Sequence, residues 1–443
     1  MSINIVILAA GQSVRMNSSI PKVMHKIAEV PALSYVLETS KQAKPDKIIL
    51  VTSPNMDKVR EFADNLHQGI IHAIQTKPLG TGDAVKSALP FLDQDGITII
   101  IYGDSPFITT ESLNKLKQQP NDISLLGFNT NNPNKYGRLI IDGDNLLKII
   151  EFNDANDEEK LITYCNSGIY SVKNNILHQL VNLIKDDNAK HEFYLTDIIK
   201  LATMRNITCK AIEVDEMEVI AFNTRAELAI AQEVMQKRIK DRLMDQGVTI
   251  ISPETSYIAY DFKAGQDITI YPNVFIGSQV SLGDEVVIRS FSHLEGVEVA
   301  DQVIIGPFAR IRPNSKIAQK AKIGNFVEIK NSNIDYEAKI NHLSYIGDSE
   351  IGYKTNVGAG SITCNYDGIS TKSKTKIGNE VSIGSNSCLI APINIANRAF
   401  IAAGSVITKD VAEDDLAFGR AKQINLNNQA KTLRDKSANN NDQ

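Results

Sequence analysis

Residues 377–407 read IGNEVSIGSNSCLIAPINIANRAFIAAGSVI, and every sixth residue of this stretch is aliphatic. The same spacing occurs upstream, at Ile305, Ile311, Ile317, Ile323 and Ile329. An aliphatic residue at every sixth position is typical of hexapeptide repeats, in which the coils of a β-helix bury these residues along one axis. The chain beyond Gly247 is therefore predicted to be a β-helix.

The six-residue pattern is interrupted between Val357 and Ile377, where residues 363–372 fit no strand. In a stacked solenoid such an insertion must loop out, and protruding loops are where binding residues gather. The pattern ends after Ile407, and the polar residues 436–443 are predicted to be a frayed tail.

The first half of the chain has a different pattern. Short apolar runs rich in Ile and Val alternate with amphipathic stretches such as residues 32–44 and 110–118, which are predicted helices. The runs are residues 4–10, 47–52, 70–74, 97–102 and 123–128. Continuous apolar runs suit strands that are buried on both faces of a mostly parallel sheet, so an α/β layered domain is predicted.

A long helix is predicted to join the two halves. Thr224 and Glu227 have the spacing of a capping box, and apolar residues then recur at helical intervals up to Gly247. They are Leu228, Ala231, Met235, Ile239 and Leu243. The predicted domains are residues 1–225, a linker helix at 226–246, and residues 247–443.

Composition excludes several classes of protein. The 443 residues are 42% hydrophobic and 22% charged, as in ordinary soluble globular proteins. The formal net charge of −5 lacks the basic footprint of a nucleic-acid-binding protein. Apolar runs are too short to span a bilayer, and the first basic residue, Arg15, comes too late for a secretory signal. Four widely spaced cysteines favour neither zinc nor disulfides, so a cytoplasmic location is predicted.

A candidate phosphate-binding loop follows the first predicted strand. It reads LAAG at residues 8–11 and is followed by Arg15 and Lys22. Small residues at the carboxyl end of a parallel strand let backbone N–H groups approach a phosphate or a base. The loop matches neither the P-loop nor the dinucleotide-binding fingerprint, and a tight turn with incidental charges is the alternative.

Two further strand ends reach the same edge of the predicted sheet. Asp104 follows a buried strand and is a candidate oxygen ligand for Mg²⁺. Gln75 offers an amide for a base edge, and Gly80 with Thr81 offers another turn rich in N–H groups. The alternative for that turn is a simple helix start before Ala84.

Two cations of the second half lie 18 residues apart, Arg312 and Lys330. With 18 residues per coil they would stack about 4.8 Å apart, the usual distance between strands. A substrate phosphate would neutralise such a pair, and Glu328 is the alternative neutralising group.

His342 is the candidate general base, because imidazole can accept a proton near neutral pH. Its neighbours in sequence are polar, whereas His293 has no comparable polar company. A structural histidine is the alternative. Asn365 and Tyr366 of the insertion could orient an amine or a thioester.

The order of motifs along nearly the whole chain resembles one bacterial enzyme family. It comprises LAAG…R-M with Pro21-Lys22, Gln75 with LGTG, YGD, YGR at 136–138, Glu151, NSG at 166–168, YLTD at 194–197 and Asn223, ahead of the hexapeptide half. The family is that of bifunctional N-acetylglucosamine-1-phosphate uridylyltransferases and glucosamine-1-phosphate N-acetyltransferases. The resemblance implies a Rossmann-like nucleotidyltransferase domain, a linker helix and a left-handed parallel β-helix.

The resemblance also implies the site residues of the first domain. Lys22 and Arg15 would neutralise phosphates, and Asp104 and Asn223 would bind Mg²⁺. N-acetylglucosamine would contact Gly137, Glu151 and Asn166. UTP would contact Leu8, Ala9, Ala10, Gly11, Gln75, Gly80, Thr81, Tyr102 and Gly103. The chain has Ser13 and Val14 where the family usually has Gly-Thr, which puts the contacts of residues 12–14 in question.

For the second domain the resemblance implies His342 as general base and a homotrimer whose active sites lie between subunits. Glucosamine-1-phosphate would contact Arg312, Lys330, Tyr345 and Asn356. Acetyl-coenzyme A would contact Ala359, Asn365, Tyr366, Ser385, Ala403 and Arg420. The family commonly has one residue fewer before Lys372, so the place of this lysine relative to the substrate phosphate is open.

The predicted function is therefore acetylation of glucosamine-1-phosphate by acetyl-coenzyme A, followed by uridylyl transfer from UTP to give UDP-N-acetylglucosamine. One alternative is a sugar-nucleotide pyrophosphorylase whose β-helix only oligomerises the chain. Another is a regulatory scaffold that binds nucleotide sugars without turnover. The candidate base His342 and the Arg312/Lys330 pair favour the bifunctional enzyme.

Overall fold

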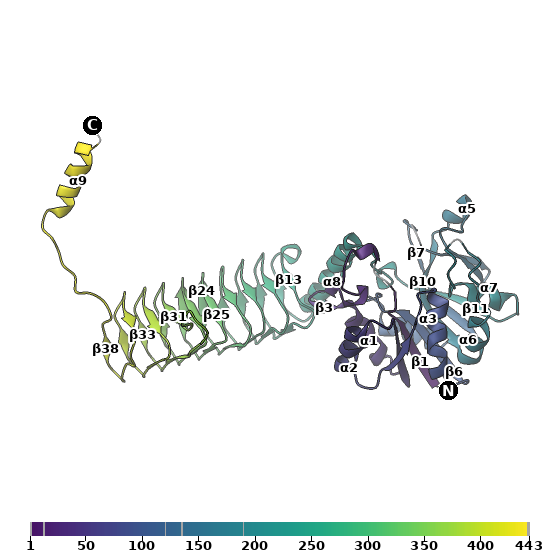
Figure 1. Ribbon diagram of the computed structural model, residues 1–443, viewed down its shortest axis with the longest axis horizontal. Coiled ribbons are helices and arrows are strands. Elements are labelled where there is room, and N and C mark those ends of the chain that lie inside the picture. The colour runs from purple at the N-terminus through teal and green to yellow at the C-terminus, as the bar shows by residue number, and fades with distance from the viewer. Residues whose placement is uncertain (1, 12–13, 120, 134–135, 189, 441–443) are drawn as a thin grey trace. The chain divides into compact units, whose positions relative to one another are not determined.

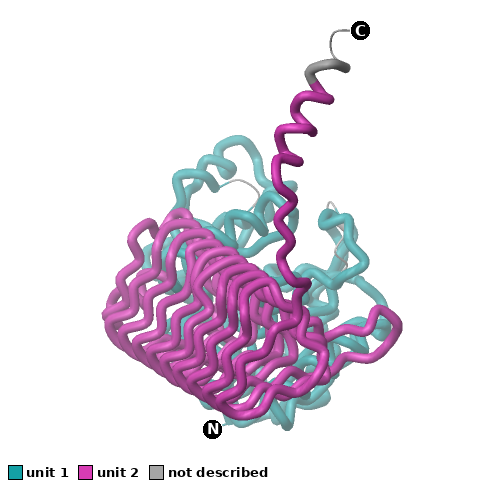
Figure 2. Tube along the Cα trace, turned by 90° about the vertical axis from the view of Figure 1, so that its left-hand side faces the viewer, with its two compact units in different colours: residues 1–239 teal, residues 240–443 magenta. Residues whose placement is uncertain are grey.

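The computed structural model describes residues 2–11, 14–119, 121–133, 136–188 and 190–440. The chain divides into two compact units, residues 1–239 and 240–443, which are coloured separately in Figure 2. The division falls inside helix α8 (Arg225–Asp245), which lies where the linker helix is predicted. Each described helix is too short or too polar to cross a membrane.

The first unit is built on a mixed sheet with the strand order β11-β7-β10-β6-β1-β4-β5 (Figure 1). Strand β1 is parallel to β4 and β6, whereas β10 is antiparallel to β6 and β7. The hairpin of β8 (Arg138–Asp142) and β9 (Asn145–Ile150) attaches to β10. The other bounds are β1 Ser2–Leu8, β4 Lys47–Thr52, β5 Ile71–Ile74, β6 Gly96–Tyr102, β7 Ile123–Asn129, β10 Tyr164–Lys173 and β11 Cys209–Glu213. All five predicted apolar runs form strands, which confirms the α/β class.

Helices cover both faces of this sheet because its central strands are apolar on both sides. Ile5 and Ile7 of β1 belong to one buried cluster, and Val6 and Leu8 belong to the other. Helices α1 (Ala32–Gln42), α2 (Asp57–Leu66) and α4 (Thr110–Lys117) contribute to the first cluster. Helices α3 (Thr81–Ala88), α6 (Asn174–Val181) and α7 (Asp197–Thr203) contribute to the second. The short helix α5 spans Asp157–Lys160.

The second unit is a parallel β-helix whose short strands form three stacks, consistent with the left-handed form (Figure 1). The first stack holds β12 (Thr249–Ile250), β15 (Thr269–Ile270), β18 (Val287–Ile288), β21 (Ile304–Ile305), β24 (Lys322–Asn325), β27 (Lys339–His342), β30 (Asn356–Val357), β33 (Ser382–Ile383), β36 (Phe400–Ile401) and β38 (Leu416–Ala417). The second holds β13 (Tyr257–Ile258), β16 (Phe275–Ile276), β19 (His293–Leu294), β22 (Arg310–Ile311), β25 (Glu328–Lys330), β28 (Tyr345–Gly347), β31 (Ile362–Cys364), β34 (Cys388–Ile390) and β37 (Val406–Ile407). The third holds β14 (Lys263–Ala264), β17 (Ser281–Leu282), β20 (Val297–Val299), β23 (Ser315–Ile317), β26 (Asn333–Ile334), β29 (Ser349–Ile351), β32 (Thr375–Ile377) and β35 (Ile393–Ile395).

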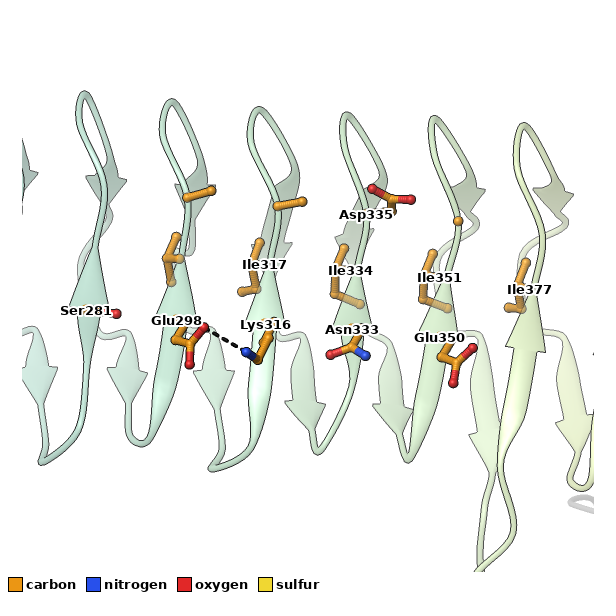
Figure 3. A pocket seen from close by; sticks show the side chains of 14 residues that line it. Ser281, Glu298, Lys316, Ile317, Asn333, Ile334, Asp335, Glu350, Ile351 and Ile377 are labelled. Atoms are coloured by element: carbon orange, nitrogen blue, oxygen red, sulfur yellow. Dashed lines mark ion pairs between the residues drawn. The ribbon is translucent and has the colours of Figure 1, made fainter.

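The chain passes from the first stack to the second at what we call the first corner, and from the second to the third at the second corner. Aliphatic residues of successive coils lie in line inside the helix, as Ile317, Ile334, Ile351 and Ile377 show in Figure 3. Neighbouring coils are offset by 17 or 18 residues, so the 18-residue coil holds only in part. A coil of 17 breaks the six-residue phase although the interior stays aliphatic.

The predicted insertion lies between β31 and β32, at the second corner, where the offset between coils rises to 26 residues. Its predicted start was wrong by two residues, because Thr363 and Cys364 belong to β31. The predicted end of the regular repeat was also wrong, since β38 adds a strand after Ile407. Residues 436–440, predicted to fray, lie in the exposed helix α9 (Gln429–Asn440).

Candidate active sites

The predicted nucleotide loop leaves β1 at the carboxyl edge of the sheet. The N–H of Ala9 donates to the carbonyl of Val51 at 2.8 Å, and the N–H of Gly103 donates to the carbonyl of Leu8 at 2.9 Å. The Ser53 hydroxyl donates to the carbonyl of Ala10 at 2.7 Å. The loop is thus fixed between β4 and β6 as far as Ala10. Gly11 is exposed, and residues 12 and 13 lie outside the described part of the chain.

Lys22 is the centre of charge in this region. It opens the short 3₁₀ helix at Lys22–Met24, and its ammonium forms an ion pair with the Asp104 carboxylate. The same ammonium donates to the Asn223 side-chain oxygen at 3.0 Å. The two predicted metal ligands therefore converge on one positive charge. Arg15 lies exposed on the 3₁₀ helix at Val14–Met16, in the same loop.

The turn after β5 is held by Gln75. Its side-chain amide donates to the Gly80 carbonyl at 3.0 Å and to Asp83 Oδ2 at 2.9 Å. Gly80 has a φ of +118°, and a Cβ there would lie 2.6 Å from the Phe193 carbonyl oxygen, so only glycine fits. The Leu195 N–H donates to the Thr81 hydroxyl at 3.0 Å. The Gln75 amide nitrogen, expected at a base edge, is thus engaged within its own loop.

The three predicted sugar contacts lie together. The Asn166 N–H donates to the Gly137 carbonyl at 2.8 Å, and a Cβ on Gly137 would lie 3.6 Å from Glu151 Oε1. The Thr196 hydroxyl donates to Glu151 Oε1 at 3.2 Å, and burial raises the pKa of Glu151. Tyr102 closes this part of the site, and burial raises its pKa. The arrangement can receive a polar ligand whose donors satisfy Glu151.

Sequence reasoning missed the residues that fasten the Lys22 loop. Arg225, at the start of α8, donates from Nε to the Met16 carbonyl at 3.3 Å, and its Nη1 lies 3.3 Å from His25 Nδ1. The N–H of Asn223 donates to Glu227 at 2.5 Å. The capping box at Thr224 was a clue to the helix start, but no sequence signal connects it with a loop about 200 residues away.

In the second unit, the first corner carries His342. His342 pairs with Asn325 across β24 and β27, and its Nδ1 lies 2.6 Å from Asn325 Oδ1. Ala359, Ser385 and Ala403 follow in the same column, linked by backbone hydrogen bonds of the corner residues Gly360, Asn386 and Gly404. The side chain of Arg420 lies beside Gly404. One corner thus gathers the predicted base and four predicted acetyl-coenzyme A contacts.

The second stack carries the predicted phosphate contacts. Backbone pairing places Arg312 opposite Lys330, as expected, but each cation has its own carboxylate. Arg312 Nη1 lies 2.9 Å from Glu328 Oε1, which is the alternative weighed from the sequence. Lys330 Nζ lies 3.8 Å from Asp348 Oδ2, and sequence reasoning did not single out Asp348. Exposed ion pairs of this kind contribute little to stability, so they can yield to a phosphate.

The remaining predicted residues lie elsewhere in the β-helix. Tyr345 opens β28 of the second stack, but Asn356 lies on β30 of the first stack. Asn365 and Tyr366 belong to the insertion at the second corner, where Tyr366 pairs with Lys372 in an isolated bridge. A single chain therefore does not bring all the predicted acetyl-coenzyme A contacts together. The expectation for His293 was wrong, because its Nε2 lies 3.2 Å from Glu295 and its Nδ1 lies 3.4 Å from Arg310.

Comparison with known proteins agrees with both halves of the chain. Residues 5–134 match the family model of the MobA-like NTP transferase domain. "Bifunctional protein GlmU" of Ruegeria sp. (strain TM1040) is 42% identical over 438 residues, which is 98% of this chain and 97% of the relative. The protein of the same name from Agrobacterium fabrum is 42% identical over 98% of this chain and 96% of its own, and that of Zymomonas mobilis is 40% identical over 97% of each.

Solved structures match the first half. A UDP-glucose pyrophosphorylase complexed with UDP-glucose aligns with a TM-score of 0.46 at 16% identity, covering 54% of this chain and 100% of the other. This likeness is too low to bear on function.

Proposed function

The chain belongs to the family of bifunctional GlmU proteins, and from this premise we propose which residues carry its two reactions. It is an enzyme of UDP-N-acetylglucosamine synthesis with uridylyltransferase and N-acetyltransferase activities. We assign uridylyl transfer to residues 1–239 and acetyl transfer to residues 240–443. Both reactions use small metabolites of the cell interior, so we propose a cytoplasmic location.

In the first reaction a phosphate oxygen of N-acetylglucosamine-1-phosphate attacks the α-phosphorus of UTP. The bond from that phosphorus to the oxygen bridging to the β-phosphate breaks, and pyrophosphate leaves. Such a reaction needs positioning and charge stabilisation more than covalent catalysis. Lys22 and Arg15 supply positive charge beside the loop at residues 8–11, while Gly137, Glu151 and Asn166 hold the sugar.

Mg²⁺ fits the oxygens of Asp104 and Asn223, since both point at the Lys22 ammonium and are ligands of the kind that this ion prefers. The described residues hold no cluster of three or more His, Cys, Asp or Glu side chains suited to a metal. Two protein oxygens with substrate phosphates match the usual mode of Mg²⁺ binding. When bound, the ion would neutralise phosphate charge.

In the second reaction the amine of glucosamine-1-phosphate attacks the thioester carbonyl of acetyl-coenzyme A. The carbon–sulfur bond breaks, and the coenzyme leaves as its thiol. His342 takes the proton from the amine. If His342 Nδ1 carries its proton and donates to Asn325, its Nε2 lone pair is free to act as base.

We also propose that the enzyme is a homotrimer whose acetyl-transfer site is shared between copies. The observation that carries this is the separation of predicted ligands of one molecule. Ala359, Ser385, Ala403 and Arg420 lie at the first corner, whereas Asn365 and Tyr366 lie at the second. A site assembled from the first corner of one copy and the insertion of the next would unite them.

Thiol release from acetyl-coenzyme A with glucosamine-1-phosphate tests the assignment. His342→Ala and Asn365→Ala proteins, each inactive alone, are dissociated together and reassembled. Random mixing gives an intact pair of corner and insertion at about a quarter of the sites, so about a quarter of wild-type activity should return. No return of activity would contradict a shared site. Absence of thiol release by the wild-type protein would favour a β-helix that only oligomerises the chain.

A further inference from the structure

Asp348 lies at the second corner, between β28 and β29, where the insertion of the following coil leaves the β-helix. It is only 8% exposed and has a φ of +48°. The two preceding coils have asparagine at the equivalent corner, Asn314 and Asn331, with φ values of +63° and +46°. Asparagine therefore satisfies the turn, and the negative charge of Asp348 needs another reason.

The carboxylate of Asp348 is fully engaged by residues assigned to the acetyl-transfer site or next to it. Asn331 Nδ2 donates to Oδ1 at 2.6 Å, and Asn365 Nδ2 donates to Oδ2. Lys330 Nζ lies 3.8 Å from Oδ2. One buried carboxylate thus contacts both a proposed phosphate ligand and a proposed acetyl-coenzyme A ligand.

Backbone hydrogen bonds place Asp348 at both ends of the insertion. Asn365, which accepts from the Ser373 N–H at 2.8 Å, is at its beginning. Thr375, at its end, donates its N–H to the Asp348 carbonyl at 3.3 Å. The Asp348 N–H itself donates to the Lys330 carbonyl at 3.0 Å. The insertion is therefore closed over this single residue.

The charge balance agrees with these contacts. Burial acts to raise the pKa of Asp348, but hydrogen bonds from Asn331 and Asn365 and the charges of Lys330 and Lys372 outweigh it, so this pKa lies below its ordinary value. Asp348 is therefore ionised at neutral pH. Lys372 is close enough to act on the same carboxylate as Lys330, which places it near the proposed phosphate contacts despite the extra residue before it.

We propose that Asp348 is a positioning residue for acetyl transfer, which fastens residues 365–374 to the second corner and sets Asn365 beside Lys330. The inference rests on the proposed function, which assigns Asn365 to acetyl-coenzyme A and Lys330 to the sugar phosphate. Asp348 touches neither substrate in this role. It acts by fixing the amide of Asn365 and the ammonium of Lys330 in one arrangement.

The test is Asp348→Asn in the full chain, because asparagine is tolerated at this turn in two earlier coils. Loss of a hydrogen bond to a charged group corresponds to about a tenfold change or more. We expect KM for acetyl-coenzyme A and for glucosamine-1-phosphate each to rise about tenfold, with a smaller change in kcat. We also expect trypsin to cleave after Lys372 and Lys374 several times faster, since the insertion is released.

Glu350→Gln is the matched control. Glu350 is two residues away and exposed on the outer face of β29, as Figure 3 shows, and it pairs only loosely with Lys376 at 3.9 Å. It should leave both KM values and the cleavage rate unchanged. Asn365→Ala releases the other end of the same contact, so it should speed cleavage as much as Asp348→Asn, and the double variant should add nothing.

The outcomes separate this inference from the proposed function. If wild-type protein releases thiol and Asp348→Asn keeps both KM values and the cleavage rate within twofold, the positioning role is wrong. If Asp348→Asn does not fold, cleavage and KM of Asn365→Ala decide, and unchanged cleavage there overturns the anchor. If cleavage accelerates as expected but wild-type protein releases no thiol, the anchor stands and the proposed function fails.

Discussion

The ammonium of Lys22 donates a hydrogen bond to the side-chain oxygen of Asn223 across 201 residues of sequence, and the same ammonium pairs with Asp104. Lys22 begins a 3₁₀ helix, Asp104 follows β6, and Asn223 precedes α8. Two oxygen ligands meet at a cation that is itself assigned to substrate phosphate. When UTP and Mg²⁺ bind, we expect Lys22 to turn toward the phosphates and leave the two oxygens to the ion.

Replacement of Asp104 should therefore separate the two activities. Asp104→Ala removes a proposed ligand and a partner of Lys22, and groups that stabilise charge in this way contribute about 10² to 10³ in rate. UDP-N-acetylglucosamine formation should fall by at least that factor, measured as pyrophosphate release. Thiol release should stay at the wild-type level, because the two units have separate cores.

Asp93→Asn is the control for that change. It removes the carboxylate of an ion pair with Lys47 at 3.0 Å, at the amino end of the neighbouring strands. Its pyrophosphate release should match that of wild type. Equal loss of both activities in a folded Asp104→Ala protein would contradict the assignment of the reactions to separate units.

Arg225 should matter for UTP binding although it touches no phosphate in the proposed site. Its bonds to the Met16 carbonyl and to His25 hold the loop that carries Arg15 and Lys22. Arg225→Ala should raise KM for UTP about tenfold with a smaller effect on kcat. Arg225→Lys should rescue little, since a single ammonium cannot make both contacts.

Arg205→Ala serves as the comparison, because Arg205 is exposed and bonds only within its own helical turn, to the Leu201 carbonyl at 3.0 Å. Steady-state pyrophosphate release at varied UTP distinguishes the two. A fall in kcat at unchanged KM for Arg225→Ala would argue that this residue acts on the chemical step.

How much could be predicted from sequence depended on whether a signal is local. The run at 97–102 and the aliphatic residue at every sixth position report burial directly, so the strands and the β-helix were predictable. The 17-residue coils were not, because shortening a corner by one residue shifts the phase without changing the aliphatic interior.

The sites divide in the same way. Residues placed by strand ends, such as Asp104 and His342, could be picked out with their chemistry from short motifs and a family resemblance. Arg225 and Asp348 could not, because each acts through partners brought near by tertiary structure. His293 shows the converse error, since its company of Glu295 and Arg310 depends partly on the next coil.

Glu151 should show a conflict between stability and function. A free glutamate has a pKa of about 4.3 in the unfolded chain, and burial raises the folded value above this. The cost of holding the carboxylate is therefore complete above the folded pKa and vanishes below about 4.3. Glu151→Gln should melt at a higher temperature than wild type at pH 7.5, with the difference shrinking toward pH 4.5, while KM for N-acetylglucosamine-1-phosphate rises.

Glu158→Gln, at an exposed position of α5, should melt like wild type at every pH. Calorimetric scans between pH 4.5 and 8 provide the comparison. A stability gain of Glu151→Gln that is constant with pH would mean that the carboxylate is not held in a costly environment.

The last prediction concerns His342 as general base. Its contact with Asn325 fixes the imidazole, and the column at the first corner places it beside the proposed acetyl-coenzyme A contacts. His342→Ala should cost about 10² to 10⁴ in the rate of thiol release, the usual contribution of a general base. KM for glucosamine-1-phosphate should change little, because phosphate binding is assigned to Arg312 and Lys330. Asn325→Ala should cost less, since the imidazole remains and only its orientation is loosened.

His293→Ala is the matched control, because this second histidine of the β-helix is also partly exposed and hydrogen-bonded but lies three coils earlier on the second stack. It should keep wild-type thiol release, and all three variants should keep uridylyl transfer with supplied N-acetylglucosamine-1-phosphate. If His342→Ala loses less than tenfold in a folded protein at neutral pH, proton transfer must lie with another group, and the Asn325 contact would then be only a structural link between coils.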